Sequence, residues 1–208
     1  MPVDWKRLQA ALQQSREGHN LQALAVYSSL MQNAETDGDR AAIVLGEASC
    51  YSQLGNVEKA RELLRSAKDY ARADRIVLSQ VELSEASLFA QEKRYDVACE
   101  KFAAVKSEYQ DLLVRDEHKD FALELDSRFG CALVDAGRFN DAILILRDIL
   151  KHDQLEDKQR AQVFFSLALM RTGNSAEAQP LLFEAARGPN AELSETALEY
   201  LSEIETAQ

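Results

Sequence analysis

The segment Leu54-Gly55-Asn56-Val57-Glu58-Lys59-Ala60 decides the fold, because its pattern of Gly followed five residues later by Ala recurs along the chain. Three further copies keep both residues, and one copy keeps the Ala but has Lys in place of the Gly. The five copies lie at 17–23, 54–60, 92–98, 136–142 and 172–178. Counted from Gly18 to Gly55, Lys93, Gly137 and Gly173, the steps are 37, 38, 44 and 36 residues. This period is typical of a repeated helical hairpin.

The chemistry of the segment explains its spacing. Gly readily adopts the left-handed backbone conformation that ends one helix, and a polar residue just after it can cap the next. Asn56 and Asn174 are expected to be such caps, and Glu177 is expected to reach back to Asn174 in a capping box. The recurring Ala is expected where the second helix of a pair crosses the first, because a methyl group lets two backbones approach closely.

Apolar residues fall at helical spacing on both sides of each Gly. The clearest copies are Phe129-Gly130-x2-Leu133-x3-Gly137-x4-Ala142-x3-Leu146 and Tyr51-x3-Gly55-x4-Ala60-x3-Leu64-x2-Ala67. These residues resemble the tetratricopeptide repeat (TPR). The resemblance implies an all-α fold, a right-handed α-α superhelix of about five helix pairs. The repeats exceed the standard length and lack its first Trp and closing Pro, so a near relative with longer helices stays an alternative.

The five recurring segments predict one solenoid domain over 1–208. Its repeats are expected at 3–33, 39–71, 74–114, 118–152 and 157–187, followed by a capping helix at 190–206 that covers the last repeat. Within these, helices are expected at 3–16, 20–33, 39–54, 57–71, 74–92, 95–114, 118–136, 139–152, 157–172 and 175–187. The step of 44 residues is expected to lengthen the two helices around 106–120 and to bury Tyr109, Leu112 and Leu113. A projecting contact surface there is the alternative. The capping helix is expected to bury Leu193, Ala197, Leu198, Leu201 and Ile204.

Composition narrows the classes of partner. The chain has three Pro and eight Gly in 208 residues, and its formal net charge is -11 with a pI of about 4.8. An acidic protein repels phosphate backbones and anionic headgroups, so nucleic acid and membranes are not expected as partners. The scattered Cys50, Cys99 and Cys131 fit thiols in a reducing compartment. No long apolar stretch occurs, and the protein is expected to be soluble and cytoplasmic.

The sequence offers no constellation for catalysis. It has no phosphate loop, dinucleotide fingerprint, zincin helix or nucleophile elbow. His19, His118 and His152 lie in different repeats, and none has a second ligand at metal-binding spacing. We therefore expect no enzyme activity, no cofactor and no metal.

The resemblance implies that the first helix of each pair lines a concave groove. Matching positions predict three columns of groove residues. The first is Leu8, Leu45, Leu83, Ser127 and Val163, the second is Leu12, Ser49, Ser87, Cys131 and Leu167, and the third is Ser15, Ser52, Ala90, Val134 and Met170. The groove is expected to be small and hydroxylated in the middle and apolar toward both ends. Alternatively, Leu8, Leu45 and Leu83 belong to the core.

These features predict a protein-protein interaction module or adaptor that binds an apolar or amphipathic segment of a protein or peptide. The Lys, Asn and Arg side chains with which chaperone-binding members of the family hold a terminal carboxylate are missing from the columns. Arg128, Arg160 and Arg171 lie nearby and could meet an acidic motif. The alternative is a structural protein that self-assembles through the groove or its terminal helix, with Trp5 and the apolar groove ends in the interface.

Overall fold

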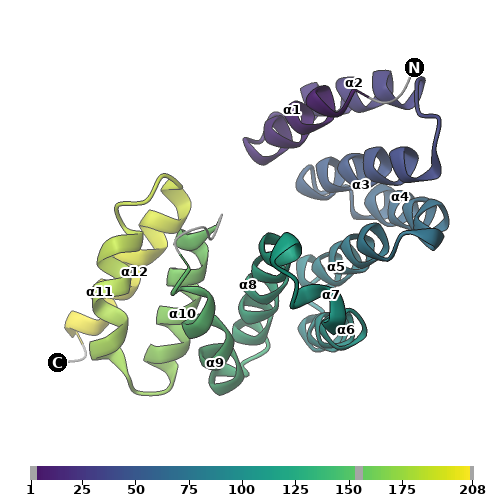
Figure 1. Cartoon of the computed structure of the whole chain (residues 1–208). Coiled ribbons are helices and arrows are strands. Elements are labelled where there is room, and N and C mark those ends of the chain that lie inside the picture. The colour runs from purple at the N-terminus through teal and green to yellow at the C-terminus, as the bar shows by residue number, and fades with distance from the viewer. Residues whose placement is uncertain (1–3, 153–156, 207–208) are drawn as a thin grey trace. The chain divides into compact units, whose positions relative to one another are not determined.

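The computed structural model describes residues 4–152 and 157–206, and their regular structure is entirely helical (Figure 1). The predicted all-α fold of repeated helix pairs is confirmed. The α-helices are α1 (Trp5–Arg16), α2 (Asn20–Met31), α3 (Asp37–Gln53), α4 (Val57–Tyr70), α5 (Arg75–Gln91), α6 (Tyr95–Glu108), α7 (Gln110–Leu113), α8 (Lys119–Asp135), α9 (Phe139–Ile149), α10 (Lys158–Arg171), α11 (Ser175–Ala185) and α12 (Ala191–Thr206). Short 3-10 turns lie at Ala71–Ala73 and Asp116–His118.

The chain divides into two compact units, which are described separately. Met1–Glu92 forms the N-terminal unit and carries α1 to α5, whereas Lys93–Gln208 forms the C-terminal unit and carries α6 to α12. The single domain expected over 1–208 stays a prediction. The predicted helix ends agree with the structure to within three residues, except around α6 and α7.

Each predicted turn adopts the left-handed conformation. The φ angles are 83° at Gly18, 76° at Gly55, 73° at Gly137 and 83° at Gly173. Lys93, which stands where the other copies have Gly, has a φ of 59°. The copy at 92–98 therefore keeps the backbone of the repeat although it lacks the residue that adopts this conformation most easily.

The predicted caps are only partly confirmed. Asn56 accepts a hydrogen bond from the backbone N–H of Lys59 at 3.1 Å, as expected of a helix cap. The prediction for Asn174 is wrong, because its side chain makes no cap bond and its amide donates to the Thr172 hydroxyl at 3.2 Å. Glu177 instead accepts from Arg147 at 2.9 Å. The two polar side chains after Gly173 thus find partners other than the expected capping box.

Small buried residues mark the crossing of the two helices in a pair. We call Gly18, Gly55, Lys93, Gly137 and Gly173 the turn positions. The small buried residues lie seven residues before them, at Ala11, Ala48, Ala86, Gly130 and Ser166. A Cβ atom added to Gly130 would lie 2.5 Å from Cδ2 of Leu146 on α9. The hydroxyl of Ser166 donates to the carbonyl of Ala178 on α11 at 3.4 Å. Ala142 and Ala178, the recurring alanines of these pairs, are fully buried, as expected at a close crossing.

Two hydrophobic clusters hold the N-terminal unit together. The first joins α1, α2 and α3 through residues that include Leu8, Ala23 and Tyr27. The second joins α3, α4 and α5 through residues that include Leu64 and Val81. Because α3 contributes to both clusters, it is the central helix of this unit.

The prediction of two lengthened helices at the 44-residue step is wrong. Helix α6 ends at Glu108, and the extra residues form α7 and the 3-10 turn Asp116–His118 before α8 begins at Lys119. The core prediction holds for Tyr109 and Leu112, which are buried, while Leu113 is half-buried. The extra residues therefore add a helical turn whose apolar side packs inward.

Helix α12 packs against α11 and α10 at the end of the C-terminal unit. Ala197, Leu201 and Ile204 are buried as predicted. Leu193 is only half-buried, and Leu198 is 57% exposed, so the prediction for Leu198 is wrong. Leu198 therefore lies on the solvent-exposed side of α12.

The buried side chain of Gln159 connects α10 to the start of α12. Its Nε2 donates to the carbonyl of Ala185 at 2.8 Å, to the carbonyl of Asn190 at 3.1 Å and to the Ser194 hydroxyl at 3.1 Å. Its Oε1 accepts from the backbone N–H of Asn190 at 3.0 Å. One side chain therefore satisfies several backbone groups around the turn that precedes α12.

Candidate binding faces on the first helices

The structure divides the fifteen predicted groove residues by burial. Most of the first column is buried, namely Leu8, Leu83, Ser127 and Val163, and Leu45 is half-buried. This burial favours the alternative in which Leu8 and Leu83 are core residues. In the other two columns Leu12 and Ser49 are exposed, Ser52, Ser87, Ala90, Leu167 and Met170 are half-buried, and Ser15, Cys131 and Val134 are buried. The assignment of these residues to a partner-binding groove stays a prediction.

Side chains of α1, α3 and α5 form one candidate surface in the N-terminal unit, where α3 packs against both other helices. We call it the N-terminal face. Its exposed and half-buried members are Trp5, Gln9, Leu12 and Arg16 on α1, Ser49, Ser52 and Gln53 on α3, and Gln80, Ser84, Ser87, Ala90 and Gln91 on α5. Arg16 is the only charged member, so this surface carries no carboxylate although the protein has a net charge of -11.

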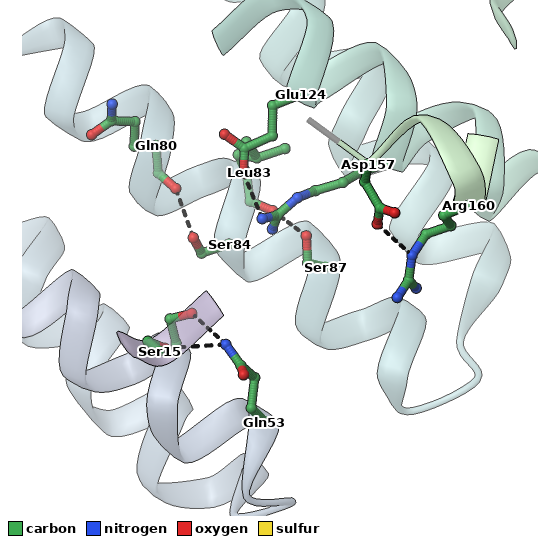
Figure 2. Close-up of polar contacts among 11 residues, drawn as sticks. Ser15, Gln53, Gln80, Leu83, Ser84, Ser87, Glu124, Asp157 and Arg160 are labelled. Atoms are coloured by element: carbon green, nitrogen blue, oxygen red, sulfur yellow. Dashed lines mark hydrogen bonds and ion pairs between the residues drawn. The ribbon is translucent and has the colours of Figure 1, made fainter. Parts of the chain in front are cut away.

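Hydrogen bonds between successive first helices cross this face. The amide of Gln53 on α3 donates to the hydroxyl of Ser15 on α1 at 3.2 Å and to Ser49 at 3.4 Å (Figure 2). The hydroxyl of Ser52 donates to Oε1 of Gln91 on α5 at 2.7 Å. In both the Ser15–Gln53 and the Ser52–Gln91 hydrogen bond, the Ser lies three residues before a turn position and the Gln lies two residues before the following turn position. We call these two hydrogen bonds the polar ladder, and each of them a rung.

Ser15 anchors the ladder because it is buried and fully used. Its hydroxyl donates to Oδ1 of Asn20 at 3.2 Å, and the thiol of Cys50 donates to it at 3.3 Å. Burial raises the pKa of the Cys50 thiol, and the hydrogen bond to Ser15 opposes that shift. Cys50 is therefore a protonated hydrogen-bond donor in the packing between α1 and α3.

The serines of α5 direct their protons into their own helix. Ser84 donates to the carbonyl of Gln80 at 2.9 Å, and Ser87 donates to the carbonyl of Leu83 at 3.0 Å (Figure 2). A hydroxyl whose proton is engaged in this way presents its lone pairs as acceptors. The N-terminal face thus combines amide groups and hydroxyl acceptors with the exposed Trp5 and Leu12 of α1.

The same repeat positions carry different chemistry in the C-terminal unit. We call this surface the C-terminal face. It consists of Glu124, Arg128, Cys131 and Asp135 on α8, Arg160, Phe164, Leu167 and Arg171 on α10, and Leu198 on α12. Arg128 donates to Glu124 at 2.5 Å, and Arg160 donates to Asp157 at 2.7 Å (Figure 2).

Two groups on α8 are perturbed by their surroundings. Burial raises the pKa of the Cys131 thiol to about 12, so this thiol is protonated at neutral pH. Burial also raises the pKa of the Asp135 carboxyl, and the charge of Arg160 opposes the shift. Arg160 of α10 thus lies close enough to Asp135 of α8 for its charge to favour the ionised carboxyl.

Sequence reasoning missed several members of both faces. Gln53 and Gln91 lie two residues before their turn positions, and Phe164 lies nine residues before Gly173. Residues two and nine residues before a turn position lie on the same side of a first helix as the residues of the second column, which lie six residues before it. Extending the columns to offsets of two, nine and thirteen residues would have found them.

The described residues offer little for other kinds of site. Within the residues that the structure describes, no group of three His, Cys, Asp or Glu side chains is placed to hold a metal ion. No helix in the same ranges is both long and apolar enough to cross a membrane.

The arrangement of the helix pairs is that of TPR-like repeat proteins. No protein-family model matches the chain, and no curated protein matches it either. Several solved structures do match the chain. The TPR-like repeats of a putative kinesin light chain from Podosopora anserina superpose with a TM-score of 0.62 at 17% identity, covering 86% of this chain and 91% of that one.

Two further structures share the fold. BtubC (BKLC) from P. vanneervenii gives a TM-score of 0.64 at 14% identity and covers 85% of this chain and 76% of its own. YrrB, a TPR protein with an unusual peptide-binding site, gives 0.53 at 14% identity and covers 93% and 90%. At these identities the similarity concerns the fold.

Proposed function

We propose that the chain is a protein-protein interaction module whose N-terminal face binds an apolar or amphipathic segment of a partner protein. The observation that carries the proposal is the polar surface of α1, α3 and α5, which has Arg16 as its one charged member and no carboxylate on a protein of net charge -11. Side-chain amides and hydroxyl acceptors suit the backbone groups of a bound segment, and the exposed Trp5 and Leu12 offer apolar contact area. The peptide-binding site of YrrB, which has the same fold, supports this class of function.

The composition supports the rest of the proposal. All three cysteines are free and buried, which supports a reducing compartment such as the cytoplasm as the location of the protein. A net charge of -11 disfavours nucleic acid as a partner. The module needs no catalytic group and no cofactor to perform this function.

The test is an affinity capture from the native lysate with the wild-type protein and two variants. Ser49→Arg with Ser87→Arg places two long cations on the N-terminal face. The matched control, Ser28→Arg with Ser107→Arg, adds the same charge at exposed serines of α2 and α6. We expect a protein captured by the wild type and the control and lost by the face variant, with equal far-ultraviolet circular dichroism for all three. Equal capture by both variants would move the site away from this face.

The alternative is that the N-terminal face binds a second copy of the chain. Trp5 is 54% exposed and Leu12 is 37% exposed, and aromatic residues are enriched in protein interfaces. Sedimentation velocity over a range of concentrations separates the two functions. A concentration-dependent oligomer that Leu12→Glu dissociates would assign the face to self-assembly, whereas a monomer at all concentrations supports an open face.

A further inference from the structure

A stripe of four side chains on α10 combines cationic ends with an apolar centre. Arg160, Phe164, Leu167 and Arg171 are spaced by four, three and four residues, so they follow one side of the helix. The two arginines are exposed, and the two apolar residues are half-buried. The equivalent positions of α3 are Ala42, Gly46, Ser49 and Gln53, which shows that the repeat does not require this chemistry.

Both arginines are available to a new partner. Arg171 makes no ion pair with a carboxylate in the ranges 4–152 and 157–206, and it lies close enough to Tyr200 to lower the pKa of a phenol that burial raises. Arg160 pairs with Asp157, but both side chains are 51% exposed. Exposed ion pairs of this kind contribute little to stability, so the guanidinium can turn to another carboxylate at small cost.

The apolar centre continues onto the neighbouring helix. Leu167 directly follows the small buried Ser166 of α10, and Leu198 directly follows the small buried Ala197 of α12. Because α10 packs against α12, the two leucines occupy equivalent positions on adjacent helices. Leu198 is 57% exposed among the residues that the structure describes.

We propose that this stripe, together with Leu198, binds an acidic amphipathic segment of a partner protein. Two carboxylates of the segment pair with Arg160 and Arg171, and apolar side chains between them pack on Phe164, Leu167 and Leu198. The proposal rests on the proposed function only in its use of the first helices, since it assigns a second face with a different ligand.

The geometry of the stripe sets the spacing of the ligand. Arg160 and Arg171 are eleven residues apart, or about 16 Å along the helix. Two carboxylates match that distance when they are eleven residues apart in a helix or roughly five apart in an extended segment. The recognition uses side chains within the segment, so a free carboxyl terminus is not needed.

Charge makes the stripe selective. The chain as a whole is acidic and repels acidic ligands, and Asp157 and Asp135 flank the stripe. A carboxylate is therefore attracted at the two arginines and repelled beside them. Complementarity of this kind fixes the register of a bound segment.

The experiment uses the full chain and a fluorescent helical peptide with an amidated terminus. The peptide carries two glutamates eleven residues apart and two leucines between them, at the spacing of Phe164 and Leu167. The face variant is Arg160→Glu with Arg171→Glu. The control variant, Lys101→Glu with Arg115→Glu, changes net charge equally at exposed residues outside α8, α10 and α12.

We expect binding by fluorescence anisotropy that weakens with added salt, that the control variant retains, and that the face variant loses by roughly tenfold or more. Binding should also weaken when the two leucines of the peptide are replaced by glutamine. Equal affinity of both variants, or no binding by the wild type, would overturn the proposal. So would a salt-sensitive dimer of the wild type that the face variant disrupts, because it would assign the stripe to a second copy. The Ser49→Arg and Ser87→Arg variant should bind this peptide normally, which separates this test from that of the N-terminal face.

Discussion

Gly46 of α3 lies directly against the ring of Tyr27 on α2, so closely that a Cβ atom added to Gly46 would lie 2.5 Å from Cζ of the tyrosine. Tyr27 is fully buried, and its hydroxyl has no hydrogen-bond partner among the described residues. The contact explains why a helix interior tolerates Gly here, since any side chain would collide with the ring.

Gly46→Ala is therefore expected to destabilise the protein, although Ala favours helix, by about 1 to 3 kcal/mol through overpacking. Chemical denaturation measures the loss. Tyr27→Phe removes an unpartnered buried hydroxyl and should leave stability unchanged or raise it. In the Tyr27→Phe background Gly46→Ala should cost less, because the added methyl no longer meets the phenolic oxygen. Equal costs in both backgrounds would show that the added methyl collides with the ring carbons, which Phe retains, and that the phenolic oxygen adds nothing to the clash.

Lys93→Gly should stabilise the protein by up to about 1 kcal/mol. A side chain in the left-handed conformation costs roughly 1 to 2 kcal/mol, and the greater freedom of Gly in the unfolded chain offsets part of the gain. The reciprocal change Gly137→Lys should destabilise, because the φ of 73° there is in the same region. Denaturation midpoints of both variants check the prediction. A less stable Lys93→Gly protein would show that the Lys93 side chain contributes more than its backbone strain costs.

Glu47→Gln should raise stability at neutral pH. Burial raises the pKa of the Glu47 carboxyl, and Lys59 opposes the shift. A pKa that is higher in the folded than in the unfolded state favours folding at low pH, and this contribution is lost as pH rises through the folded value. Glutamine has no such loss, so its advantage should be present at pH 7 and should disappear below roughly pH 4. Unfolding free energies of both proteins between these pH values measure it. An advantage that persists in acid would point to packing instead.

Gln159→Ala should loosen the start of α12. The change leaves the N–H of Asn190 and the carbonyls of Ala185 and Asn190 without the side chain that they now bond, at a cost of about 1 to 3 kcal/mol. Hydrogen exchange should speed up at Asn190 and the first turn of α12, and less in α8. Gln159→Glu is an informative companion, because it keeps the acceptor for Asn190 and removes the donor. Unchanged exchange in Gln159→Ala would show that burial of Leu201 and Ile204 alone fixes the helix.

Much of the fold could be predicted from the sequence because residues adjacent in the sequence determine where each helix of the repeat ends and the next begins. The position of Gly55 before Asn56 predicts a helix end followed by a cap, and both occur. The same reasoning failed at Asn174, because the nearby Thr172 hydroxyl offers the amide an acceptor that no pattern of spacing reveals. It failed again after Glu108, where helix-favourable residues form a separate turn instead of extending α6.

The candidate faces could be predicted only in part. The second column identified Leu12 and Ser49 as accessible, but periodicity alone could not separate Leu83, which is buried, from Ser87, four residues later on the same helix. Burial of a first-helix residue depends on how closely the next pair packs, and that distance is not encoded within one repeat. The pairing of Ser52 with Gln91 is a relation between repeats, so it becomes visible only when their helices are placed side by side.

The polar ladder is directional, because in each of its two hydrogen bonds the serine belongs to the earlier helix and the glutamine to the later helix. Helix α3 carries both halves of a rung, because Gln53 reaches back to Ser15 and Ser52 reaches forward to Gln91. Helix α5 keeps Gln91 but has Ala90 where the forward serine would be. If the α3–α4 hairpin were duplicated in tandem, Ser52 of the first copy would face Gln53 of the second copy and could form the same hydrogen bond. A tandem copy of the α1–α2 hairpin would instead place Arg16 where the hydrogen bond needs a glutamine amide. The α3–α4 hairpin is thus suited to tandem duplication, and repeat-protein engineering on this scaffold would begin from it.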